Sequence, residues 1–344
     1  MAAKTKPFWG FVPSNVPASV VAAQAKMQED AGLQGLLAVQ LYSTPFVPLA
    51  VAATATSSVR LLSGIALAFV RSPYETALHA MDLDHVSGGR FTLGLGASVR
   101  SLSEEIYGMP YGKPLEHMRE VVEIVRMVIS KAHTGELDRY EGVYHRHDFS
   151  ALKWLAPPPP LRTNLPIWIA ALRGPLVSLA AEIGDGVMGH PIWSVPWATT
   201  KIPEALARGL KRGAKQRSDI EFQVGLFVAA GNDRAEAVND ARATVAFYAG
   251  AVQYEEYFAA HGFRAEARRL QEAVQRGGYE SASHLVPDEM AQTFVVCGTP
   301  DEVRKKIEPV WEVADSLLLA PPAYALSPQK LMAYAGAIAS TFYG

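Results

Sequence analysis

Hydrophobic and polar residues follow two different patterns along the chain. Short apolar runs, typical of buried strands, are separated by longer segments in which apolar residues recur at helical spacing. The most regular of these longer segments lies between Lys113 and Lys131, where Met118, Val122 and Val125 fall on one face. We therefore expect a chain in which strands and helices alternate.

Eight apolar runs are candidates for strands. They cover residues 7–12, 35–41, 59–70, 90–96, 165–171, 185–190, 220–231 and 315–322. Helical segments separate most of them, and such alternation is typical of a parallel sheet with helices outside. Eight units in 344 residues fit a closed α/β fold, the (β/α)8 TIM barrel. A doubly wound open sheet remains the alternative, because the number of strands does not prove closure.

One segment near the C-terminal end departs from this alternation. Residues 251–290 are polar and rich in Glu and Arg. We interpret them as part of a helical insertion before the last strand, at about residues 246–293. The chain as a whole, residues 1–344, is expected to form a single domain.

Two further segments have a local signature. Residues 139–155 alternate and hold several aromatic side chains, which indicates a hairpin or an irregular excursion. Residues 293–314 are interpreted as a capped helix with Thr299 at the N-cap, Pro300 at the first position and Glu302 at the third.

The composition excludes several classes of protein. Apolar residues make up 49% of the chain and charged residues 19%, with a formal net charge of −2 and no basic cluster that would favour nucleic acid. No apolar run is long enough to span a membrane, and no signal peptide is expected at the start. The single cysteine, Cys297, excludes an internal disulfide and fits the reducing cytosol, so we expect a cytoplasmic protein.

The stretch GRFTLGLGAS, residues 89–98, invites comparison with a dinucleotide-binding loop. That fingerprint needs a third glycine where this chain has Val99, and it belongs after the first strand rather than the fourth. We favour a strand whose glycine-containing end lets a flat ligand lie against the backbone. In a (β/α)8 barrel, that end of the strands carries the active site.

A second loop, residues 170–180, joins the fifth strand to a helix. Arg173 and Gly174 follow two alanines, and Pro175 opens the helix. The free N–H groups of a helix start favour an anion, and an arginine adds a charged donor. A plain strand-to-helix turn is the alternative.

Histidines are the other candidates for chemistry. His145 and His147 have no acidic or cysteine partner at ligand spacing, so we expect no metal site. His190 ends the sixth strand, where an imidazole could donate a hydrogen bond or a proton. The sequence holds no nucleophile motif and no evident acid–base pair, which suits an enzyme whose cofactor carries the difficult chemistry.

The segment LDHVSGGRFTLGLGAS, residues 83–98, closely resembles a signature of the bacterial luciferase-like superfamily. YGKPLEHMREVVEIVRMV, YEGVYHRHDF, LPIWIAALRGPLVSLAAEIGDG and GTPDEVRKKI match further parts of that pattern in order, so the resemblance spans most of the chain. It is most similar to the branch that uses coenzyme F420, a deazaflavin hydride carrier. The FMN-dependent monooxygenases are the nearest alternative.

The resemblance implies a TIM barrel with a flavin-type ring at the strand ends and a non-proline cis peptide at Gly64-Ile65. It implies hydride transfer between the cofactor and a small organic substrate, in an enzyme that is a homodimer. The cofactor-binding positions that it implies are Gly64, Ile65, Gly96, Ala97, Ser98, Ala170, Ala171, Leu172, Arg173, Gly174, Pro175, Gly189 and His190.

The chain departs from the family pattern where an acid would be expected. Gln40 stands at the end of the second strand, where many deazaflavin enzymes carry Asp or His, and Val99 replaces a glutamate found in some relatives. The catalytic residue is therefore unknown, with Gln40 and His190 as candidates. A barrel that binds cofactor without catalysis is the alternative from another class.

Overall fold

The computed structural model describes residues 7–343, which fall into two compact units. The first unit consists of residues 9–188 and 205–221, and the second consists of residues 7–8, 189–204 and 222–343. Each unit is described by itself.

Parallel strands form the centre of the first unit. Their order is β1 (Phe8–Phe11), β2 (Gly35–Ala38), β3 (Arg60–Ser63), β5 (Phe91–Gly96), β8 (Ile167–Ala171) and β9 (Gly186–Gly189). Pairing is parallel from β1 through β8, with Gly35 opposite Arg60 and Leu93 opposite Ile167. The strands are almost wholly buried, which explains why they are continuous apolar runs in the sequence.

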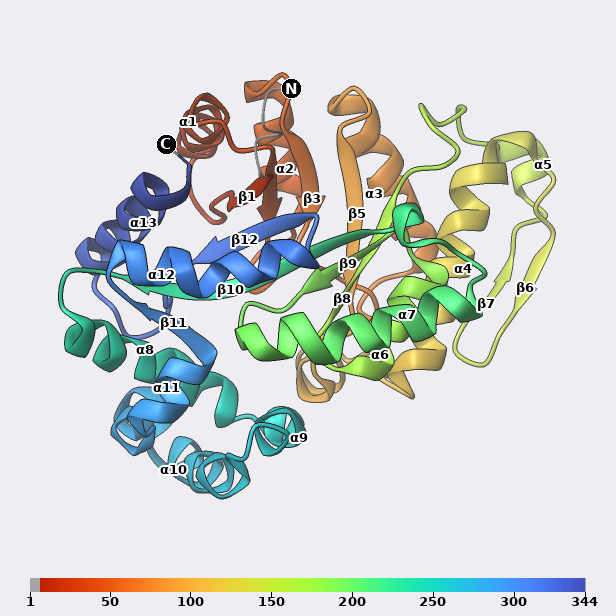
Figure 1. The fold of residues 1–344 in the computed structure, drawn as a ribbon. Helices are drawn as coiled ribbons and strands as arrows, with labels where there is room; N and C mark the ends of the chain where they lie inside the picture. The colour runs from red at the N-terminus through yellow and green to blue at the C-terminus, as the bar shows by residue number, and fades with distance from the viewer. Residues whose placement is uncertain (1–6, 344) are drawn as a thin grey trace. The chain divides into compact units, whose positions relative to one another are not determined.

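The helices of the first unit follow its strands along the chain (Figure 1). They are α1 (Ala18–Asp30), α2 (Phe46–Ala55), α3 (Pro73–Val86), α4 (Pro114–Lys131), α6 (Gly174–Ile183) and most of α7 (Ile202–Arg212). The apolar stripe that predicted α4 is buried, and α4 contacts α3 and α6. The expected hairpin is present as β6 (Arg139–Glu141) and β7 (Arg146–Asp148), and the short helix α5 (Leu152–Leu155) follows it.

The third apolar run is not one continuous strand. It divides into β3 and the two-residue β4 (Ala66–Leu67), on either side of a cis peptide bond between Gly64 and Ile65. β4 pairs with β5, where Leu67 lies opposite Gly96. The break therefore lies beside the end of the glycine-containing strand.

The second unit contains β10 (Glu221–Ala230), β11 (Val295–Gly298) and β12 (Ser316–Ala320), with β10 in the middle and parallel to both neighbours. Its helices are α8 (Arg234–Ala249), α9 (Glu255–Ala259), α10 (Arg264–Ala282), α11 (Asp288–Phe294), α12 (Pro300–Ile307) and α13 (Pro328–Phe342). Figure 1 shows α9, α10 and α11 grouped together, which is the expected helical insertion.

One local interpretation needs correction. Residues 293–314 were expected to be helical, but β11 opens this segment as a fully buried strand beside β10. The helix begins only at Pro300, where Thr299 and Glu302 form the expected capping box. Three β-branched or sulfur-containing side chains in a row at 295–297 pack better on a buried strand than in one helical turn.

The fold class is a (β/α)8 TIM barrel with a helical insertion before the last strand, as the sequence predicts. Its eight strands are β1, β2, β3, β5, β8, β9, β10 and β12. That residues 1–344 act as a single domain, with an insertion at 246–293, stays a prediction.

Candidate cofactor site at the strand ends

The cis peptide forms the first part of the candidate site. Gly64 and Ile65 are partly exposed, whereas the residues on both sides of them are buried. Ser63 ties this bulge to β5, because its hydroxyl donates to the Gly94 carbonyl (2.9 Å) and accepts from the Gly94 N–H (2.8 Å). The bulge is therefore the accessible part of an otherwise buried strand pair.

The two glycines of β5 make room for neighbouring groups. A Cβ on Gly94 would overlap the Ser63 carbonyl oxygen, so Gly94 allows two backbones to approach. A Cβ on Gly96 would overlap the Ile65 side chain, so the space at Gly96 is filled by Ile65 rather than left for a ligand. A flat ring at this strand end would consequently face Ile65.

The backbone after β5 turns sharply at Ser98, which has a φ of +57°. The Ser98 carbonyl accepts a hydrogen bond from the Tyr111 hydroxyl (3.1 Å). Burial raises the pKa of Tyr111, while the positive charges of Arg100 and Arg173 act in the opposite direction. The strand end at Ser98 and the loop at Arg173 thus share Tyr111 as a neighbour.

Two histidines hold Tyr111 in place. His117 Nδ1 lies 3.1 Å from the Tyr111 carbonyl, which can only accept, so this nitrogen carries the proton. His117 Nε2 then accepts from His145 Nε2, 3.0 Å away. Burial and the neighbouring His117 and His147 lower the pKa of His145 to about 4, so the pair is neutral at pH 7.

The start of α6 forms the anion-binding part of the candidate site. Arg173 is the N-cap, no side chain caps the helix, and the first turn contains no acidic residue. A guanidinium nitrogen of Arg208, on α7, lies 3.7 Å from where a Cβ on Gly174 would stand. Within residues 7–343, neither Arg173 nor Arg208 forms an ion pair with a carboxylate. The helix start therefore presents two unpaired positive charges.

Arg208 was not singled out from the sequence. It lies more than thirty positions after Gly174 in a helix with several basic residues, and only the packing of α7 against α6 brings it to this loop. No sequence signal distinguishes it from Lys211 or Arg212.

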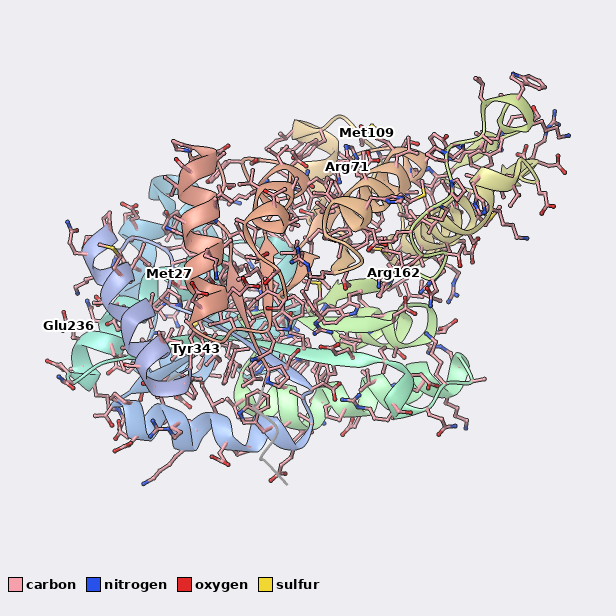
Figure 2. All side chains as sticks on the ribbon, turned by 90° about the horizontal axis from the view of Figure 1, so that it is seen from above. Met27, Arg71, Met109, Arg162, Glu236 and Tyr343 are labelled. Atoms are coloured by element: carbon pink, nitrogen blue, oxygen red, sulfur yellow. The ribbon has the colours of Figure 1, made fainter. Side chains whose placement is uncertain are left out.

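Both ends of the Gln40 amide form hydrogen bonds, and its place as a catalytic candidate stays a prediction. Its Oε1 accepts from the Leu67 N–H (3.0 Å) and from Arg71 (2.9 Å), and its Nε2 donates to the Tyr107 hydroxyl (3.1 Å). Gln40 is a buried amide that positions Arg71 and Tyr107, neither of which was singled out from the sequence. Arg71 follows β4 and is labelled in Figure 2.

Gly189 and His190 belong to the second unit. The Ile192 N–H donates to His190 Nδ1 (3.1 Å), so the imidazole proton is on Nε2, 3.2 Å from the Tyr254 hydroxyl. Burial lowers the pKa of His190 to about 4. The imidazole is therefore neutral at pH 7, and it can donate a hydrogen bond but holds no extra proton to give.

The predicted residues therefore divide between the units. The first unit contains Gly64, Ile65, Gly96, Ala97 and Ser98 at two neighbouring strand ends, and residues 170–175 at the end of β8. Gly189 and His190 lie in the second unit, and the cofactor-binding role of all these residues stays a prediction. Among residues 7–343, no group of three or more His, Cys, Asp or Glu side chains is arranged to hold a metal ion. None of the described helices is long and apolar enough to cross a membrane.

These strand ends, at the carboxyl side of a parallel barrel, are where (β/α)8 enzymes place their active sites. The family model for luciferase-like monooxygenases matches residues 7–314, and the chain belongs to that family.

Several of the similar proteins have names that describe an activity. A putative coenzyme F420-dependent oxidoreductase of Mycobacterium tuberculosis is 32% identical over 89% of this chain and 90% of its own. A 5,10-methylenetetrahydromethanopterin reductase of Archaeoglobus fulgidus is 30% identical over 82% of this chain and 83% of its own. The solved structure of a coenzyme F420-dependent tetrahydromethanopterin reductase from Methanopyrus kandleri superimposes with a TM-score of 0.80 at 22% identity, covering 98% of both chains.

Proposed function

We propose that the protein is a coenzyme F420-dependent oxidoreductase that transfers a hydride between the deazaflavin and a small organic substrate. The observation that carries the proposal is the start of α6, where Arg173 and Arg208 leave two positive charges without carboxylate partners. The names of the relatives support F420 over other anionic cofactors.

The residues of the first unit fit such a cofactor. The N-terminal end of α6 and Arg173 would hold its phosphate, with Arg208 as a second cation. The Ile65 side chain, which packs against Gly96, would contact one face of the ring. Ser98 and Tyr111, which are joined by a hydrogen bond, would lie at the edge of the ring. Bound there, a deazaflavin supplies the hydride acceptor or donor. The protein's own groups bind it, orient it and exclude water.

His190 is a further candidate for contact with the cofactor or the substrate. Its neutral Nε2–H bonds to the Tyr254 hydroxyl in this structure, so donation to a ligand oxygen would require that hydrogen bond to be exchanged. We expect His190→Gln, which retains an N–H donor, to keep more cofactor affinity than His190→Ala in a fluorescence titration.

Titration of the purified apo-protein with F420 and with FMN, followed by fluorescence, tests the cofactor. We expect micromolar or tighter binding of F420 and weaker binding of FMN. Micromolar FMN binding with no F420 binding would overturn the proposal in favour of a flavin monooxygenase. F420 binding without any turnover on a panel of carbonyls and alcohols would favour a non-catalytic barrel.

Two further features belong to this proposal. We place the protein in the cytoplasm, since its single cysteine, Cys297, is a free, buried thiol and the chain has no internal disulfide that would need an oxidising compartment. We also expect a homodimer, which sedimentation velocity at micromolar concentration would detect as twice the 37.2 kDa chain mass.

A further inference from the structure

Arg71 is a largely desolvated cation with neutral partners. Its guanidinium donates to the Leu67 carbonyl (3.3 Å) and to Gln40 Oε1 (2.9 Å), and it lies over the Phe46 ring at 5.3 Å. A carbonyl, an amide and an aromatic face stabilise a positive charge, but none of them neutralises it.

No carboxylate forms an ion pair with Arg71 within residues 7–343. Glu75 attracts Arg71 electrostatically, but it is exposed and forms no ion pair with it. The main influence on Arg71 is burial, which lowers the pKa of the guanidinium. Because a desolvated charge is costly without a counter-ion, an arginine in this state favours an anion from outside the chain.

The hydrogen bonds of Gln40 fix the direction of Arg71. Both partners of Oε1, the Leu67 N–H and Arg71, can only donate, so the amide orientation is determined and its oxygen is fully used. Gln40 is 8% exposed, so the contact is shielded from water. The remaining N–H groups of Arg71 have no acceptor among the described residues.

Tyr107 adds a second donor beside this cation. Its hydroxyl accepts from Gln40 Nε2 (3.1 Å), and its own O–H has no acceptor among the described residues. The Tyr107 side chain is 37% exposed, so a small molecule can reach it. The Gln40 amide thus positions two donors. Its oxygen accepts from the cationic Arg71, and its nitrogen donates to the neutral Tyr107 hydroxyl, which keeps its own O–H for another acceptor.

The place of this cluster in the fold connects it to the candidate cofactor site. Leu67, which bonds to both Gln40 and Arg71, lies two residues after Ile65 and opposite Gly96. The cluster is therefore attached to the same strand end as the cis-peptide bulge.

We infer that Arg71 and Tyr107, positioned by Gln40, bind the carboxylate of a small organic substrate. The inference rests on the proposed function, because it assigns the substrate class of the same site. The guanidinium fork matches a carboxylate, and the Tyr107 hydroxyl donates to one of its oxygens.

Matched pairs of small molecules test the inference without knowledge of the natural substrate. Benzoate is compared with benzamide, and butyrate with butyramide, by calorimetric titration of the full-length protein with and without F420. We expect at least one carboxylate to bind in the millimolar range or tighter, and to bind at least tenfold more tightly than its amide. If neither carboxylate is preferred to its amide, the inference is wrong.

Two variants assign the binding to this cluster. Arg71→Gln should weaken carboxylate binding at least tenfold, and Tyr107→Phe, which keeps the ring, should weaken it about threefold to tenfold. Arg276→Gln, at an exposed arginine of α10 in the second unit, is the matched control and should bind like the wild type. Unchanged affinity in both Arg71→Gln and Tyr107→Phe, with native circular dichroism, would place the carboxylate elsewhere and overturn the inference.

The affinity of the same variants for F420 separates this inference from the proposed function. We expect Arg71→Gln to bind F420 as the wild type does. A tenfold loss of F420 affinity in Arg71→Gln would mean that Arg71 serves the cofactor and would overturn the assignment to substrate. Carboxylate binding that depends on Arg71, in a protein that does not bind F420, would support the carboxylate site and contradict the proposed cofactor.

Discussion

At the scale of single residues, the two glycines of β5 support backbone and side-chain packing. Gly94 lets β3 approach β5 at Ser63, and Gly96 makes room for Ile65. We therefore expect a ligand in the candidate site to contact the Ile65 side chain, which packs against Gly96. The ligand would not contact the backbone of β5 at Gly96, because Ile65 covers it.

Gly94→Ala should destabilise the protein by about 1–3 kcal/mol or more, because the added Cβ would overlap the Ser63 carbonyl, which is backbone and cannot rotate away. Urea unfolding followed by circular dichroism measures the change. Gly336→Ala is the matched control. This helical glycine has open space around it, so we expect a gain of about 0.5–1 kcal/mol. Equal stability of the two variants would contradict the packing at Gly94.

Arg173→Ala should weaken F420 binding by about 1–3 kcal/mol, the cost of losing one charged hydrogen bond. Arg208→Ala should weaken it in the same direction, and the fluorescence titration described above measures both. Arg146→Ala, at an exposed arginine of β7, serves as the control. If both variants bind as tightly as the wild type, the phosphate does not lie at the start of α6.

At the scale of secondary-structure elements, the hairpin of β6 and β7 is held to α4 by polar groups. Glu120 of α4 accepts from the backbone N–H groups of Val143, Tyr144 and His145. His145 also bonds to His117 of the same helix. The hairpin thus depends on a neutral histidine pair that is linked through Tyr111 to Ser98.

This histidine pair predicts a pH dependence of stability. The pKa of His145 is lowered to about 4 in the folded protein, compared with about 6.5 in an unfolded chain, so the unfolded state binds more protons between these values. The contribution of His145 to the free energy of unfolding is therefore complete above about pH 6.5 and is lost as the pH falls towards 4.

Urea unfolding of wild type and His145→Gln at pH 7.5 and pH 5 checks this expectation. The loss of stability on acidification should be smaller in His145→Gln than in the wild type. His284→Gln, at an exposed histidine, should retain the wild-type dependence. A His145→Gln variant with the full wild-type loss would show that His145 does not titrate as the structure implies.

The capping box of α12 is a further feature at this scale. The Thr299 hydroxyl accepts from the Glu302 N–H, and the Glu302 carboxylate accepts from the Thr299 N–H (2.9 Å). Thr299→Ala should lower the free energy of unfolding by about 0.5–2 kcal/mol. Thr163→Ala, at an exposed loop position, should change the urea midpoint much less.

At the scale of the whole molecule, the alternation of strands and helices favoured the barrel but left a doubly wound open sheet as the alternative, and the family resemblance decided between them. The eight apolar runs all correspond to barrel strands, because buried parallel strands are continuous apolar segments. β11 was missed because the four-residue apolar run at 295–298 directly precedes a strongly capped helix, and the cap dominated the interpretation.

Less of the candidate site than of the fold could be predicted from the sequence. The strand ends and the α6 start follow from motifs that are local in the chain, and the cis bond at Gly64-Ile65 was implied by the family resemblance. Arg208, Arg71 and Tyr107 were not found, because each reaches its partners through packing between distant elements. From the sequence, Gln40 was notable only because it stands where related enzymes carry an acid. In the structure it positions two donors, Arg71 and Tyr107.

The most direct test of the central claim is a crystal structure of the protein with F420 bound. We predict the phosphate within hydrogen-bonding distance of the Gly174 N–H and of the Arg173 guanidinium, with the deazaflavin ring against Ile65. A cofactor bound away from both the α6 start and the cis-peptide bulge would contradict the account.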